Sequence, residues 1–92
     1  MIYVVSYELG KPSSPTNSLI TIDAIKNVGK SWMRLNQSAW LVESDDGVTE
    51  IRDKLKVKLR EQDVIFVAQL DGNWASRNMG DVRSNWLKVR PF

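Results

Sequence analysis

The carboxylate of Glu8 has the most distinctive setting for chemistry in this chain, because it follows the apolar run of a predicted strand, Ile2–Leu9. A carboxylate at a strand end can ligate magnesium or transfer a proton. Magnesium sites in proteins use one or two carboxylates together with water, so Glu8 would need at least one further ligand. A homodimer with Glu8 near its twofold axis would bring a second copy. Glu8 is therefore a candidate catalytic residue and metal ligand, and an ordinary acidic residue at a strand end is the alternative.

Basic side chains that can contact nucleic acid come from two parts of the chain. Arg34 lies in an alternating strand pattern on the same face as Trp32. The remaining three are spaced four residues apart on one face of a predicted helix: Arg52, Lys56 and Arg60. Acidic residues early in that helix and basic residues late in it also suit the helix dipole, which explains part of the basic face without a ligand. Contact with a phosphate backbone and an ordinary solvated face both stay open.

The composition narrows the chemistry. The 92 residues contain no cysteine and no histidine, which excludes disulfides, thiol nucleophiles, imidazole bases and the usual zinc sites. Any metal must be held by oxygen ligands, and this favours magnesium, manganese or calcium. Residues 1–50 hold four Lys/Arg against six Asp/Glu, whereas residues 51–92 hold nine against five. The C-terminal half is thus basic, as expected for a nucleic-acid contact or for a solvated surface.

The length predicts one domain spanning residues 1–92, with a small but adequate core. No apolar run approaches the roughly 20 residues of a transmembrane helix. The N-terminal segment MIYVVSYELG lacks the basic start and the cleavage site of a signal peptide. We therefore expect a cytoplasmic protein without membrane contact.

The elements that would position these side chains are organised around a predicted hairpin at residues 31–44. Its first strand begins at residue 31, and its second strand is nearly all apolar and ends at residue 44. A helical pattern lies on each side of the hairpin, and a strand pattern lies outside each helix. In chain order the predicted elements cover residues 2–9, 15–29, 31–44, 48–60 and 63–70. This order predicts a ferredoxin-like βαββαβ sandwich of class α+β, with an antiparallel sheet and two helices on one face.

Two apolar patterns carry further expectations. The first helix has apolar residues at a spacing of three, Leu19, Ile22, Ile25 and Val28, which predicts its buried stripe. The C-terminal stretch Val82–Val89 is read either as a short helix with Val82, Trp86 and Val89 on one side, or as a strand that reaches a partner. The four tryptophans favour a core or dimer interface over a stacking platform for bases.

The run VVSYEL, residues 4–9, resembles the first strand of a family of small ferredoxin-like proteins. The family comprises the CRISPR-associated integration subunit of the second type, its SinR-like relatives and, more distantly, the virulence-associated protein D ribonucleases. The pattern W-x-R-L-x-x-S-x-W-L-V, from Trp32 to Val42, looks most like the SinR-like relatives. The same holds for Ile51-Arg52-Asp53-x-Leu55, for Asp63 to Val67, and for Trp74-Ala75 and Trp86-Leu87-Lys88 in the tail. The resemblance covers nearly the whole chain, and it depends on the order and spacing of these motifs.

The resemblance implies a homodimer, often with the C-terminal segment crossing to the partner sheet, and nucleic acid as the ligand. Some members of the family are magnesium-dependent endonucleases with a symmetric pair of aspartates after the tyrosine of the first strand. The matching position here, after Tyr7, is Glu8, whose extra methylene moves the carboxylate by about one carbon–carbon bond, roughly 1.5 Å. Arg34 and Ser38 match the hairpin pattern of the family and are expected to contact phosphate or to shape the turn.

Two functions follow as expectations. The first is a nucleic-acid-acting protein that resembles a metal-dependent endonuclease of RNA or DNA. Glu8 from each subunit would hold magnesium, whose bound water would attack a phosphodiester, and Arg34 with the basic helix would steer the backbone. The second is a non-catalytic homodimeric adaptor, or a protein-binding module of the toxin–antitoxin type.

Overall fold

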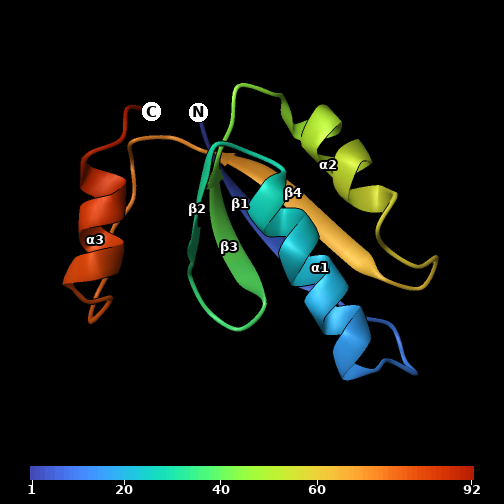
Figure 1. Ribbon diagram of the computed structural model, residues 1–92. Helices are drawn as coiled ribbons and strands as arrows, with labels where there is room; N and C mark the ends of the chain where they lie inside the picture. Colours follow the sequence, from blue (N-terminus) through green and yellow to red (C-terminus); the bar gives the residue numbers. More distant parts are fainter.

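The computed structural model describes residues 1–92 and contains one four-stranded antiparallel sheet with helices on both faces (Figure 1). The elements in chain order are β1 (Ile2–Glu8), α1 (Pro15–Asn27), β2 (Ser31–Arg34), β3 (Ala39–Glu43), α2 (Val48–Lys56), β4 (Val64–Leu70) and α3 (Asp81–Lys88). The strand order is β2-β3-β1-β4, and every neighbouring pair is antiparallel. The predicted ferredoxin-like α+β fold is confirmed, and an additional helix follows it.

Alternation along β1 divides the core into two clusters, because successive side chains of a strand point to opposite faces. Tyr3 and Val5 are buried in the cluster under α1 and α2, which also contains Trp40, Ile51 and Leu55. The even-numbered side chains of β1 point to the other face, under α3. The sheet is therefore covered on both faces, and the two helices of the βαββαβ unit share one of them as predicted.

Helix α1 begins where the sequence indicates. Ser14 is its N-cap and forms a capping box with Asn17, and Pro15 is the first helical residue. Of the predicted buried stripe, Ile25 is fully buried and Ile22 and Val28 pack against the core, whereas Leu19 is 67% exposed. Thr21 is the second buried residue of the helix. The Thr21 hydroxyl donates to the Asn17 carbonyl at 3.0 Å, so its burial leaves no unsatisfied polar group.

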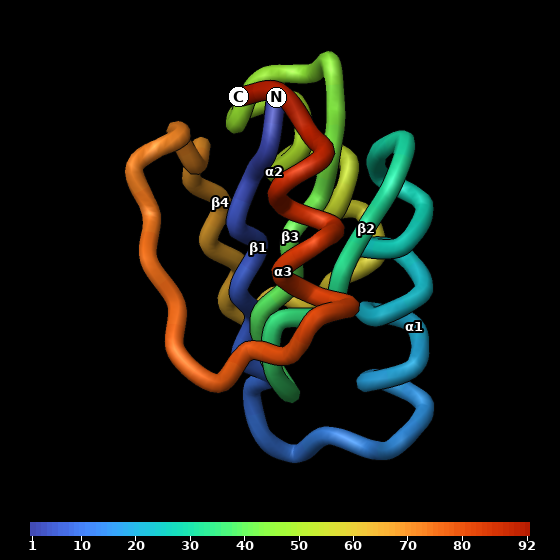
Figure 2. The backbone as a smooth tube through the Cα atoms, turned by 90° about the vertical axis from the view of Figure 1, so that its left-hand side faces the viewer, coloured from blue at the N-terminus to red at the C-terminus, as the bar shows by residue number.

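Helix α3 lies across the second face of the sheet, in front of β1 and β3 in Figure 2. Leu87 is its buried residue and joins a cluster with Ile2, Met33 and Leu41. The helical interpretation of the tail is correct. Of the three residues predicted on one side of it, Trp86 packs against this cluster, whereas Val82 is 85% exposed and Val89 is 75% exposed.

Polar contacts of α3 explain this orientation. The Trp86 indole N–H donates to Ser31 Oγ at 3.1 Å, and Arg90 Nη2 donates to the same oxygen at 2.9 Å. Arg83 Nη1 donates to the Leu35 carbonyl at 2.9 Å. These bonds attach α3 to both ends of β2 and turn Leu87 toward the sheet. None of the helices is sufficiently long and apolar to span a bilayer.

Candidate functional site

Glu8 is the last residue of β1 and lies directly opposite Val64 in the ladder with β4. Its side chain is exposed and belongs to the sheet face that α3 partly covers. No group of three or more acidic side chains in the chain is arranged to hold a metal ion. A single chain therefore offers one exposed carboxylate at Glu8, and a magnesium site there would need further ligands from water, from a bound phosphate or from a second copy.

Two apolar side chains beside Glu8 are exposed on the same face. Val64 is 53% exposed and Phe66 is 62% exposed; Phe66 pairs with Ser6 in the ladder. Together they form what we call the β4 patch, Val64 and Phe66. The sequence pattern predicted this strand and placed the two residues on one of its faces, but it did not indicate that this face is exposed. The edge position of β4 is decided by tertiary structure, and no signal in the sequence distinguishes it.

Arg34 closes the turn between β2 and β3. Its guanidinium donates from Nε to the Asn36 carbonyl at 3.2 Å and from Nη2 to the Gln37 carbonyl at 2.9 Å. Its Cζ lies 5.0 Å from the ring centroid of the buried Trp40, within cation–π range. Two of the five guanidinium N–H groups are thus used within the turn, so Arg34 has a structural role in the hairpin.

Ser38 belongs to the same turn. Its backbone N–H donates to Asn36 Oδ1 at 3.1 Å, and its carbonyl accepts from the Tyr7 N–H at 3.0 Å. The Tyr7 hydroxyl donates to the Gln37 carbonyl at 3.2 Å. Of the two expectations for Ser38, these contacts favour a turn residue.

The exposed tryptophan on the outer strand is Trp32, and its ring is already in contact with other side chains. Lys26 Nζ lies 4.6 Å from the Trp32 ring centroid, and the Trp40 ring meets Trp32 edge-on with 5.3 Å between centroids. Trp40 is 1% exposed, and its indole N–H has no acceptor. The pair packs α1 against β2 and β3, and the expected core role holds for Trp40, whereas Trp32 is 42% exposed.

Arg60 was predicted on the basic face of the second helix, and this placement is wrong because α2 ends at Lys56. Arg60 lies in the turn before β4, where Nη2 donates to Asp63 Oδ1 at 2.8 Å and Nε donates to Oδ2 at 3.2 Å. Nη2 also donates to the Gly10 carbonyl at 2.8 Å, and Nη1 to the Pro12 carbonyl. These bonds to the loop after β1 keep Arg60 out of the helix in which the sequence predicted it.

Asp63 completes this cluster. Its side chain is 3% exposed, and Oδ1 accepts from the Gly10 N–H at 2.9 Å. The hydrogen bond from Arg60 lowers the pKa of the Asp63 carboxyl, and burial opposes this only in part. Arg60 and Asp63 therefore tie the loop after β1 to the start of β4, and the guanidinium is largely occupied.

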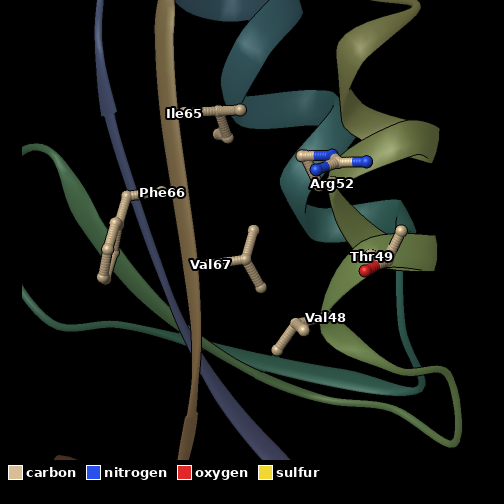
Figure 3. Close-up of a pocket in the computed structure, with 6 residues that line it drawn as sticks. All are labelled: Val48, Thr49, Arg52, Ile65, Phe66 and Val67. Atoms are coloured by element: carbon tan, nitrogen blue, oxygen red, sulfur yellow. The ribbon is translucent and has the colours of Figure 1, made fainter.

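Arg52 and Lys56 are exposed on α2, beside the outer edge of β4. Two adjoining hollows, of about 220 and about 560 Å³, separate this side of α2 from the strand, and both are lined by Arg52 and Ile65. Figure 3 shows Ile65 and Val67 directed toward α2, with Phe66 on the opposite side of the strand. We call this continuous depression the α2–β4 groove, with Arg52 and Lys56 on its wall and Ile65 and Val67 on its floor.

The predicted site residues thus fall into three places. Arg52 and Lys56, together with Arg60, line the wider hollow. Arg34 lies on β2, at the opposite edge of the sheet from β4. Glu8 lies on the sheet face that α3 covers, apart from both the hollow and the β2 edge. Within one chain the Glu8 carboxylate thus lies on a different sheet face from Arg34, Arg52 and Lys56, and the expected site, which two subunits would share, stays a prediction.

Comparison with known proteins adds no family: no family model matches the chain, and no curated protein matches it either. The similarity to the SinR-like relatives therefore stays a prediction from the motifs.

Proposed function

We propose that the protein is a homodimeric binding module, in which two copies associate through the β4 patch and act by holding a partner protein. The observation that carries this proposal is the exposure of Phe66, 62%, on an edge strand. A large aromatic side chain that remains in water gives no stability to the monomer, whereas aromatic residues are enriched at interfaces.

The properties of the patch support a second copy as its occupant. Strand β4 carries no charged residue from Val64 to Leu70, so two copies of the patch would meet without like-charge repulsion. A twofold contact places the same surface on both subunits, which an apolar, uncharged patch tolerates. Glu8 would lie at the rim, where its carboxylate stays hydrated.

A second candidate is the expected nucleic-acid-acting protein, a magnesium-dependent endonuclease of RNA or DNA. It is favoured by the position of Glu8, which lies across the ladder from Val64 of the patch. A different twofold contact, centred on Val64 and Glu8 and not on Phe66, would bring two copies of Glu8 near one axis, and each would then supply the second carboxylate that the other lacks. Arg52 and Lys56 would remain exposed for contact with the phosphate backbone.

Sedimentation at several micromolar concentrations tests the dimer. We expect a wild-type dimer and a monomeric Phe66→Asp variant, because an aspartate in the contact would be buried without a partner. The matched control is Val57→Asp, since Val57 is 78% exposed at the end of α2, on the sheet face opposite the patch; it should remain dimeric. A wild-type monomer at the highest concentration would contradict the proposal.

A cleavage and gel-shift panel separates the two candidates. Single- and double-stranded RNA and DNA are incubated with magnesium, manganese or chelator, with wild type beside Glu8→Ala. The binding module predicts no cleavage and identical behaviour of the two proteins. Metal-dependent cleavage that disappears with Glu8→Ala would establish the nuclease instead. Salt-sensitive binding without cleavage would indicate a nucleic-acid scaffold.

A further inference from the structure

Strand β4 has one free side. The strand order places β1 on one side of it and no strand on the other. Free backbone donors and acceptors on such an edge pair readily with another extended chain.

The hydrogen-bonding pattern identifies which residues of β4 are free. Tyr7 N–H donates to the Ser38 carbonyl and Ser44 N–H donates to the Met1 carbonyl, each at 3.0 Å, so the odd-numbered residues of β1 bond toward β3. Successive residues of a central antiparallel strand bond alternately to its two neighbours. The even-numbered residues of β1 therefore bond to β4, where their register partners are also even-numbered. The backbone groups of Ile65, Val67 and Gln69 consequently point outward from the sheet.

Nothing in the sequence of β4 protects this edge. The strand has seven residues, all in register with β1, and it contains no proline, glycine, lysine or arginine. Proline, charged side chains and bulges are the usual devices that prevent an edge from pairing. The free edge is thus competent to accept another strand along its length.

The α2–β4 groove runs beside this edge and supplies contacts for side chains. A strand added to β4 would direct alternate side chains toward the apolar floor, Ile65 and Val67, and toward α2. The remaining side chains would lie on the opposite face, beside Phe66. The combination of a free edge and an adjoining groove is the arrangement that binds extended peptides by strand addition.

The wall of the groove determines the charge of the ligand. Lys56 has no ion-pair partner, and the contact of Arg52 with Asp53, at 3.0 Å, joins two side chains that are 55% and 57% exposed. Exposed pairs of this kind are weak and are readily replaced. Glu61 and Asp63 line the wider hollow together with three cations, Arg52, Lys56 and Arg60. Because the Asp63 carboxylate is paired with Arg60, Glu61 is the one acid there without an ion pair. An acidic side chain is the complement of Arg52 and Lys56.

We infer that the α2–β4 groove binds an extended segment of a partner protein, which adds to β4 as a strand and places acidic side chains at Arg52 and Lys56. This inference rests on the proposed function as a binding module, because it names the surface that would hold the partner. It differs from the β4 patch, which lies on the other face and would hold the second copy.

The probe is a synthetic peptide, acetyl-Thr-Val-Glu-Val-Glu-Val-Thr-amide, and its binding to the full chain is measured by calorimetry. We expect saturable binding with a dissociation constant below about 1 mM. A peptide with lysine in place of glutamate and a peptide with alternate backbone amides methylated should both bind at least about tenfold more weakly. Absence of saturable binding at about 1 mM, or equal binding of all three peptides, would overturn the inference.

Two protein variants test the same contacts from the other side. Val67→Pro removes an outward N–H and no bond to β1, a position that tolerates proline on an edge strand. Val67→Ala is its control, since it loses the same packing and keeps the N–H; we expect the proline variant to bind the probe about tenfold more weakly than the alanine variant. Circular dichroism verifies that both variants are folded. Equal affinities would contradict strand addition.

Charge is tested with Arg52→Glu combined with Lys56→Glu, which should weaken the probe at least tenfold and reverse the preference for glutamate over lysine. The control, Lys58→Glu with Lys88→Glu, makes the same change of net charge on exposed residues outside the groove. Competition by an oligothymidylate that depends on Arg52 and Lys56 would reassign the groove to nucleic acid.

Sedimentation separates failure of this inference from failure of the proposed function. We expect Val67→Pro to remain dimeric while its binding of the probe weakens. Loss of the dimer in Val67→Pro, with Val67→Ala unaffected, would show that a second copy occupies the edge and would overturn the groove inference. A wild-type dimer that does not bind the probe would leave the dimer proposal intact and remove only the groove.

Discussion

The two edges of the sheet carry aromatic side chains in opposite situations. On β2, Trp32 is 42% exposed, but it contacts Lys26 and Trp40, and α3 is bonded to both ends of the strand. On β4, Phe66 is 62% exposed and α3 does not reach it. The β2 edge is short: Lys30 precedes the strand, and the turn that Arg34 closes follows it. The β4 edge is longer and carries no charged residue. The difference shows that the aromatic side chain of one edge is packed within the chain and that of the other remains available to another chain.

The largest expected effect on folding comes from removing the attachment of α3. Leu87→Ala deletes a side chain that is 3% exposed in the cluster with Ile2, Met33 and Leu41, and we expect a loss of about 2–5 kcal/mol in unfolding free energy. Val82→Ala on the same helix should change stability by less than about 0.5 kcal/mol. Urea denaturation of both variants measures the difference. Equal stabilities would show that α3 does not cover the sheet in solution.

The two edge aromatics provide the direct comparison. Trp32→Ala removes the contact with Lys26 and the edge-on contact with Trp40, and it should destabilise the fold by about 1–3 kcal/mol. Phe66→Ala should change the unfolding free energy of the monomer by about 0.5 kcal/mol or less. Thermal unfolding is measured at low protein concentration, where association does not contribute. The same loss in both variants would mean that the edges are not different in the way the contacts indicate.

The start of β4 should respond to acid. The pKa of Asp63 is lowered in the folded state, chiefly by Arg60, so the unfolded state binds the proton more readily. The stabilisation is then complete above the ordinary aspartate pKa of about 3.9 and is lost as pH falls through the lower folded value. We expect Asp63→Asn to be less stable than wild type at pH 7, with the two curves converging below about pH 4 in urea titrations. A constant difference at all pH values would contradict this role.

The smallest effect is expected at the closed turn. Arg34→Gln removes hydrogen bonds to the Asn36 and Gln37 carbonyls, and it should cost about 0.5–1.5 kcal/mol in unfolding free energy. Because Arg34 lies at the edge opposite the groove, binding of the acidic peptide should not change. A nucleic-acid gel shift that weakens in this variant would restore the expected phosphate contact.

The sequence determined the local structure of this protein. Ser14 with Pro15 fixed the start of α1, and the apolar alternation of residues 2–9 and 63–70 predicted two strands. Together with the hairpin these signals are sufficient for the βαββαβ order, because periodicity and capping act over neighbouring residues. The candidate site was predicted less well. The sequence singled out Glu8, Arg34 and Arg52 as candidate residues, but it did not indicate that they lie on three separate surfaces.

Tertiary structure decided the features that depend on distant contacts. Arg60 lies outside α2 because its guanidinium donates hydrogen bonds to the carbonyls of Gly10 and Pro12, some fifty positions away in the sequence. Leu87 was selected over Val82 and Val89 by the bonds between α3 and β2. The open edge of β4 follows from the strand order alone. A pattern of side chains records which residues are apolar, but only the packed chain determines which of them another element covers.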